Sequence, residues 1–196
     1  MEKRLNFKII GSGPTGIFLS IVLSKLNLNI FLTDLLNKEK LIHKDKTYAI
    51  THSTRIILKK FHIWQKLKPY LYGFDTLSIT DTITSSYTNL SISDLDEDIS
   101  DAKNIGWVIK HSDLMKILFQ EIDNKENIIF KSPQKLSQEK ISFDYFFIST
   151  GANSIEKKYK KSIDIKKFYN HSCLTFKVLV RGNNEKRAYE IFRKEG

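Results

Sequence analysis

Three glycines near the start of the chain have the spacing of a phosphate-binding turn. They stand in a G-x-G-x-x-G pattern at Gly11, Gly13 and Gly16. In such a turn the first glycine allows a tight bend, the second lets the backbone approach a pyrophosphate, and the third lets a helix pack close to a strand. The N–H groups and the dipole at the start of the following helix then favour negative charge. The candidate dinucleotide-binding residues are Gly11, Ser12, Gly13, Pro14, Thr15 and Gly16.

The segments on either side of this turn have the patterns that would position it. Residues 5–10 and 28–32 are short apolar runs, and residues 17–26 have the apolar spacing of a helix. Asp34 follows eighteen residues after Gly16, close to where an acid accepts hydrogen bonds from an adenosine ribose. We therefore predict a dinucleotide-binding strand–helix–strand unit. The alternative is an ordinary structural turn between a strand and a helix.

The chain is long enough and apolar enough to bury a sizeable core. Its 196 residues are 41% hydrophobic, which suits one large domain or two small ones. The single cysteine, Cys173, excludes an intramolecular disulfide and indicates a reducing compartment. The first apolar run is too short for a signal peptide, and the sequence has no run of about 18 apolar residues that could cross a membrane. We expect a cytoplasmic protein, or at most one bound peripherally to the inner membrane.

The charge of the chain raises the question of nucleic-acid or metal binding. The net charge is +10 at pH 7, but the lysines are spread along the chain, and residues 157–161 form its main basic run. Because no zinc spacing or nucleic-acid-binding motif accompanies them, a solvated basic surface is favoured and no nucleic-acid partner is expected. The acids between Asp94 and Asp101 lack the spacing of a calcium loop, and the histidines lack partners at ligand spacing. We therefore expect no metal site.

The rest of the sequence alternates between helical and strand patterns. Residues 35–46 form a polar connection, and residues 53–68 have the apolar spacing of a helix that buries Trp64. Ser112 is predicted to cap a later helix. The predicted strands lie within residues 76–92 (two strands joined through 84–86), 106–110, 127–130 and 143–149, and in a hairpin between residues 172 and 192. These patterns predict an α/β nucleotide-binding core with a β-rich insertion and tail.

Five segments, in order along the chain, carry a resemblance to a known family. They are GSGPTG with Asp34, KTYAITHSTRIILKKFHIWQKL, WVIKHSDLMKILFQEI, FDYFFISTGANS and AYEIFRKEG. With these segments the chain resembles the N-terminal half of the FAD-dependent aromatic hydroxylases, and it is most similar to those of ubiquinone biosynthesis. The resemblance implies an α/β fold with a Rossmann-like FAD-binding core. Residues 1–75 and 103–165 would form this core, and residues 76–102 and 166–196 would begin an antiparallel substrate-domain sheet.

The resemblance also implies an activity and roles for particular residues. In that family NAD(P)H reduces the FAD, and oxygen then hydroxylates an electron-rich ring, here a polyprenylated phenol. The glycines would hold the FAD pyrophosphate, and Asp34 the adenosine ribose. Lys46 falls at a family arginine near the flavin side, His111 at a family asparagine that faces FAD, and Gly151 at the glycine of an Asp-Gly motif. No catalytic acid or base is nominated.

Two positions and the length depart from the family's pattern. Lys46 keeps the charge of the arginine without its planar fork, and Thr150 brings no carboxylate in place of the aspartate. The family's chains are about twice as long and carry a second FAD motif, Gly-Asp-Ala. We therefore expect a separately encoded C-terminal half, or a ubiquinone-biosynthesis complex, as partner. Two other functions stay open: a truncated, inactive or split module of this fold with weak FAD affinity, and an NAD-dependent reductase.

Overall fold

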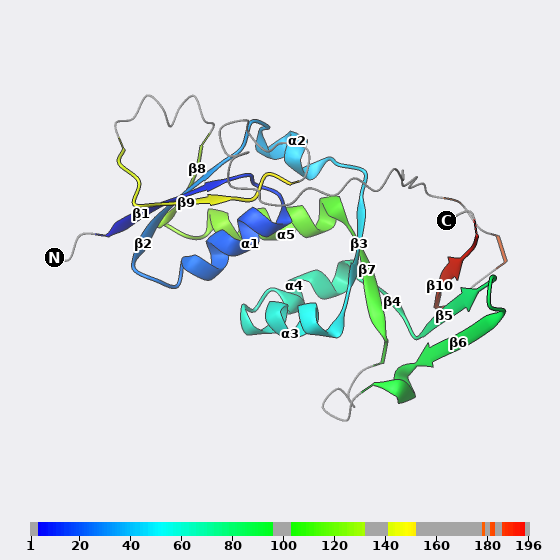
Figure 1. Ribbon diagram of the computed structural model, residues 1–196. Helices are drawn as coiled ribbons and strands as arrows, with labels where there is room; N and C mark the ends of the chain where they lie inside the picture. Colours follow the sequence, from blue (N-terminus) through cyan, green and yellow to red (C-terminus); the bar gives the residue numbers. More distant parts are fainter. Residues whose placement is uncertain are drawn as a thin grey trace.

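The computed structural model describes residues 4–95, 103–131, 141–151, 178, 181–182 and 186–194, in which three sheets are joined by short helices (Figure 1). The elements, in chain order, are β1 (Leu5–Ile10), α1 (Pro14–Leu23), β2 (Leu28–Thr33), α2 (Lys38–Ile42), β3 (Thr47–Ile50), α3 (His52–Lys60), α4 (Trp64–Leu67), the 3-10 turn η1 (Lys68–Tyr70), β4 (Tyr72–Phe74), β5 (Thr76–Asp81), β6 (Ser86–Ser91), the 3-10 turn η2 (Ile92–Asp94), β7 (Gly106–Lys110), α5 (His111–Asp123), β8 (Ile128–Lys131), β9 (Tyr145–Ile148) and β10 (Arg187–Phe192).

A parallel sheet with the strand order β8-β2-β1-β9 lies at one end of the molecule. Helices α1 and α5 lie beside each other against it (Figure 1). Ile9, Ile30 and Leu32 of the sheet are fully buried, as is Ile17 of α1. The predicted strand–helix–strand unit is confirmed, because apolar residues of these three elements close one shared core.

A second sheet, with the order β3-β7-β4, is antiparallel and carries α3 and α4. The rings of Trp64 and Trp107 meet edge to face with centroids 4.9 Å apart, and both are buried, which confirms the prediction for Trp64. The prediction of one helix over residues 53–68 is wrong. The chain breaks after α3, where His62 has a φ of 59°, and this turn lets the fully buried Ile63 enter the core before α4.

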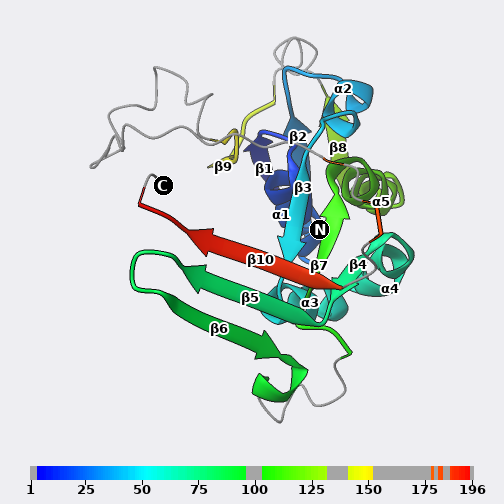
Figure 2. The same ribbon diagram turned by 90° about the vertical axis from the view of Figure 1, so that its right-hand side faces the viewer.

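The third sheet, with the order β10-β5-β6, lies at the opposite end of the molecule from the parallel sheet (Figures 1 and 2). Strands β5 and β6 are the predicted antiparallel pair. Strand β10, however, pairs with β5 in parallel register from Arg187 to Phe192, so this sheet is mixed. The predicted hairpin between residues 172 and 192 stays a prediction. Its other arm, and the turn between the arms, fall almost entirely outside the described residues.

Two segments differ in detail from the sequence-based predictions. The polar connection after Asp34 contains a short helix, α2, whose first turn is capped by the Asn37 side chain. Helix α5 begins at His111 with Lys110 as its N-cap, so Ser112 lies inside the helix and does not cap it.

Some segments named in the sequence analysis lie outside the described residues: the basic run at residues 157–161, Cys173 and most of the acidic loop. Within the described ranges no helix is long and apolar enough to cross a membrane.

Candidate functional site

The glycine turn joins β1 to α1 and is held by backbone hydrogen bonds. Gly11 has a φ of 103°, a left-handed conformation that side chains rarely adopt. Its N–H donates to the Thr33 carbonyl at 2.8 Å, which ties the turn to the end of β2. A Cβ at Gly11 would stand 2.5 Å from the Ser149 carbonyl oxygen. Both the backbone angle and the close approach therefore require glycine here.

The other two glycines have opposite surroundings. A Cβ at Gly16 would stand 1.9 Å from the Gly11 carbonyl oxygen and 2.6 Å from Ser149 Oγ, so only glycine lets α1 start this close to the strands. A Cβ at Gly13 would meet nothing within 4 Å. Gly13 is thus the point where another molecule can approach the backbone, whereas Gly16 closes the packing beneath it.

Two side chains hold the turn from outside its own sequence. Asp34 accepts hydrogen bonds from the Ser12 N–H at 2.7 Å and from the Leu36 N–H at 3.0 Å, using one carboxylate oxygen for each. Ser149 Oγ, at the end of β9, donates to the Gly11 carbonyl at 2.8 Å. The candidate acid Asp34 therefore stabilises the turn itself, and Ser149 is a supporting residue that sequence reasoning missed.

The start of α1 presents backbone donors beside Gly13. Gly13 is the N-cap and makes no side-chain capping bond, and Pro14, which follows, has no N–H. The Ile17 N–H donates to the Gly13 carbonyl at 3.0 Å, so the N–H groups of Thr15 and Gly16 precede the ladder of the helix. These groups and the helix dipole make the turn a site of positive potential.

A groove of about 190 Å³ opens over this turn; we call it the glycine-turn groove. It is lined by Gly13, Pro14, Thr15, Leu41, Lys44, Lys46, Tyr48, His111, Met115, Ser149, Thr150 and Gly151. The structure thus brings Lys46, His111 and Gly151 to the same groove as the turn. Four of the candidate residues do not line it: Gly11, Ser12 and Gly16 are parts of the turn that face away from the groove lining, and Asp34 holds the turn through the Ser12 N–H.

His111 and Tyr48 form a hydrogen-bonded pair in the wall of this groove. His111 Nε2 lies 2.7 Å from the Leu41 carbonyl oxygen, and Nδ1 lies 2.8 Å from the Tyr48 hydroxyl. Burial lowers the pKa of His111 below its usual 6.5; the bond to Leu41 opposes this shift, and the charges of Lys44 and Lys46 add to it. Burial also raises the pKa of Tyr48 above 10. Both side chains are therefore neutral at pH 7.

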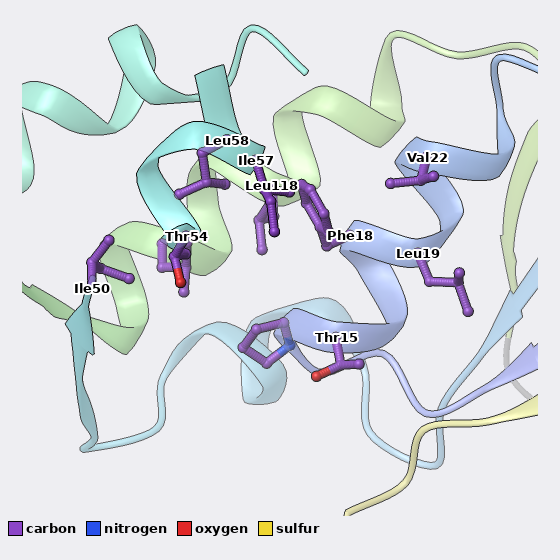
Figure 3. Close-up of a pocket in the computed structure, with 11 residues that line it drawn as sticks. Thr15, Phe18, Leu19, Val22, Ile50, Thr54, Ile57, Leu58 and Leu118 are labelled. Atoms are coloured by element: carbon purple, nitrogen blue, oxygen red, sulfur yellow. The ribbon is translucent and has the colours of Figure 1, made fainter. Parts of the chain in front are cut away.

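A second cavity, of about 540 Å³, lies on the other side of the first turn of α1; we call it the apolar groove (Figure 3). Its lining comes from α1, β3, α3 and α5: Pro14, Thr15, Phe18, Leu19, Val22, Ile50, Thr54, Ile57, Leu58, Leu114 and Leu118. Pro14 and Thr15 line both grooves. The two threonine hydroxyls are its main polar groups, and no lining residue is charged. Among the described residues, no three His, Cys, Asp or Glu side chains gather as a metal site.

Comparison with known proteins finds relatives in both sequence and structure. No family model matches the chain. An uncharacterised protein, slr1300, of Synechocystis sp. (strain ATCC 27184 / PCC 6803 / Kazusa) is 24% identical over 135 residues, which are 69% of this chain and 31% of that protein.

Three solved structures that resemble this chain are named as oxygenases. The p-nitrophenol 4-monooxygenase PnpA from Pseudomonas putida DLL-E4 matches 67% of this chain with a TM-score of 0.53 and 10% identity. PqsL, a probable FAD-dependent monooxygenase from Pseudomonas aeruginosa, matches 66% with a TM-score of 0.52 and 9% identity. A 2-methyl-3-hydroxypyridine-5-carboxylic acid oxygenase matches 67% with a TM-score of 0.52 and 11% identity.

This chain spans about a third of the length of each of these proteins: 32% of PnpA, 33% of PqsL and 32% of the pyridine-carboxylate oxygenase. At such identities the likeness establishes the architecture and leaves the activity to the site. The predicted fold class is confirmed: over two-thirds of its length the chain has the α/β fold of these monooxygenases.

Proposed function

We propose that this chain is the FAD-binding part of an aromatic-ring monooxygenase. The observation that carries the proposal is the glycine-turn groove, where an open glycine, a helix start and two lysines meet within a fold shared with oxygenases. The group that fits this combination is a dinucleotide with a negatively charged pyrophosphate. The neighbours act on aromatic rings according to their names, which supports the class of substrate.

The residues present fit FAD at three points. The N–H groups of Thr15 and Gly16 would donate to the pyrophosphate beside the open Gly13, and Lys46 would add positive charge. Each oxygen of Asp34 accepts one backbone hydrogen bond and keeps a lone pair for a ribose hydroxyl. The Ser12 hydroxyl is buried without a hydrogen-bond partner in the described part of the chain, so the turn holds one further polar group to satisfy.

Once bound, FAD supplies the oxygen-transfer chemistry, and the protein supplies binding, orientation and shielding from water. In this chain the turn would fix the phosphates, and Ser149 and Gly151, which follow the end of β9, lie along the groove. Gly151 has a φ of 79°, which lets the backbone turn sharply beside the site. None of these residues needs to act as an acid or base.

The finer proposals rest on the resemblance of the sequence segments. They are NAD(P)H as electron donor, a polyprenylated phenol of ubiquinone biosynthesis as substrate, and peripheral contact with the inner membrane. The apolar groove supports the proposal of an apolar substrate beside the cofactor, because this groove shares Pro14 and Thr15 with the glycine-turn groove. A companion polypeptide is also proposed as partner, since the solved monooxygenases have about three times the length that this chain matches.

The test is a titration of the purified chain with FAD, followed by the change in flavin fluorescence. Saturable binding is expected. Lys46→Gln should weaken it by about threefold, since an exposed charge contributes under about 1 kcal/mol. Lys60→Gln, which removes an exposed lysine of α3 that lines neither groove, is the matched control. Absence of FAD binding would contradict the proposal, and tight NADH binding without FAD binding would favour a reductase.

A further inference from the structure

The hydrogen bonds of His111 fix which of its ring nitrogens carries the proton. The Leu41 carbonyl can only accept, so Nε2, 2.7 Å away, must donate to it. Burial keeps the ring neutral, and a neutral imidazole has one donor and one acceptor. Nδ1 is therefore the acceptor, and the Tyr48 hydroxyl, 2.8 Å away, donates to it.

The direction of this bond decides what Tyr48 can offer to the groove. A tyrosine hydroxyl has one proton, and Tyr48 uses it in the hydrogen bond that it donates to His111 Nδ1. The oxygen keeps its lone pairs, and Tyr48 lines the glycine-turn groove. At this point the groove wall therefore accepts hydrogen bonds. A phosphate oxygen is also an acceptor and finds no partner at Tyr48, whereas a ligand hydroxyl finds one.

We propose that Tyr48 is a binding residue that accepts a hydrogen bond from a hydroxyl of the bound cofactor, and that His111 is the residue that positions it. This inference rests on the proposed FAD function and deepens it. It gives the groove two kinds of binding group. The start of α1 and Lys46 hold phosphate, and Tyr48 takes a sugar-like hydroxyl. The position of a bound dinucleotide along the groove is thereby fixed by two unlike interactions. His111, which the resemblance places in contact with FAD, is then a residue that supports Tyr48.

The tautomer is tested without any cofactor, by NMR of the unchanged protein with nitrogen-15 in its histidine rings. At pH 7.5 the signals of His111, assigned by their loss in His111→Asn, should report a neutral ring protonated at Nε2. A ring protonated at Nδ1, or at both nitrogens, would overturn the inference because Tyr48 could then donate to a ligand.

The ligand part is tested by FAD titration of Tyr48→Phe. Losing one hydrogen bond should weaken binding by roughly threefold to tenfold. Tyr72→Phe, which removes an exposed hydroxyl on β4, is the matched control and should bind like the unchanged protein. Equal affinity of Tyr48→Phe and the unchanged protein would overturn this inference alone. If the unchanged protein does not bind FAD, the proposed function and the ligand part fail together.

Two fragments of FAD identify the hydroxyl. If Tyr48→Phe binds FMN more weakly than the unchanged protein does but binds ADP equally well, the hydroxyl lies on the ribityl chain of the flavin. The reverse result would place the hydroxyl on the adenosine ribose. Either result supports the inference, whereas weaker binding of inorganic pyrophosphate by Tyr48→Phe would contradict it.

The positioning role of His111 is tested by two substitutions. His111→Asn keeps an acceptor oxygen for the Tyr48 hydroxyl and should bind FAD within about twofold of the unchanged protein, whereas His111→Leu removes the acceptor and should lose about as much as Tyr48→Phe. A purely structural role would lower the melting temperature of His111→Leu without changing FAD affinity in the folded protein, and that result would remove His111 from the proposal.

Discussion

The two grooves on either side of the first turn of α1 share Pro14 and Thr15 but are built in different ways. The glycine-turn groove is set by the backbone: a left-handed glycine, a helix start without a capping side chain, and partly buried hydrogen bonds. The apolar groove is set by the carbon atoms of side chains from four elements. It contains no charged group and little polar surface.

The two grooves differ in how well their walls tolerate substitution. At Gly16 the backbone leaves no room for an added atom, because the Gly11 carbonyl cannot move without opening the turn. A wall of apolar side chains can repack around a changed neighbour at modest cost. Substitutions at the packed positions of the glycine turn should therefore have large and specific effects on stability, and substitutions at the open edge of the apolar groove should have small ones.

The largest effect is expected for Gly16→Ala. The added Cβ would lie 1.9 Å from a backbone oxygen, so α1 must move away from the sheet, at a cost of about 3 kcal/mol of unfolding free energy. Urea unfolding followed by circular dichroism measures it. Gly13→Ala is the matched control, because its Cβ meets nothing within 4 Å, and its stability should change by less than about 0.5 kcal/mol. Gly13→Ala should still weaken FAD binding. Equal stability of the two variants would contradict the distinction between the two glycines.

The next effect is expected for Asp34→Asn. The carboxylate accepts two backbone hydrogen bonds with two oxygens, and an amide offers only one oxygen. One N–H would face an NH2 group, so we expect a loss of about 1–2 kcal/mol in unfolding free energy. Glu126→Gln, an exposed carboxylate after α5, controls for the loss of charge. If both variants unfold at the same urea concentration, Asp34 does not hold the turn.

A smaller effect is expected from pH, through His111. Its folded-state pKa lies below 6.5, so below that pH the unfolded chain binds a proton that the folded protein does not. Stability at this site is therefore complete above pH 6.5 and is lost as the pH falls towards the lowered pKa. Unfolding free energies at pH 7.5 and pH 5.5 should differ more for the unchanged protein than for His111→Asn. The other histidines are common to both proteins and cancel. An equal difference would contradict the role given to burial.

The features that could be predicted from the sequence are local ones. The turn and its flanking strands were readable because glycine spacing and apolar runs are properties of neighbouring residues. The gathering of Lys46 and His111 at the groove was anticipated through the family resemblance. The sequence around Ser149 and Tyr48 gave no indication of their roles, because these roles depend on hydrogen-bond partners far away in the chain.

The errors have the same origin. The apolar spacing around His62 suits a continuous helix, and only packing of Ile63 against the rest of the core favours the break. The partner of β10 was likewise not predictable: it pairs with a strand about a hundred residues earlier, and alternation of apolar residues does not say which neighbour a strand takes or in which direction.

The smallest effect is expected for Ile57→Ser at the edge of the apolar groove. Ile57 is 48% exposed, so its loss removes little buried surface, and the unfolding free energy should change by less than about 0.5 kcal/mol. Leu58→Ser, at the next residue, is the matched control, because Leu58 is 6% exposed and should cost several times more. Because Ile57 belongs to the accessible wall, Ile57→Ser should also reduce the binding of a hydrophobic fluorescent dye. A large loss of stability in Ile57→Ser would mean that the groove is a closed part of the core, and the contrast between an exacting backbone site and a tolerant apolar one would fail.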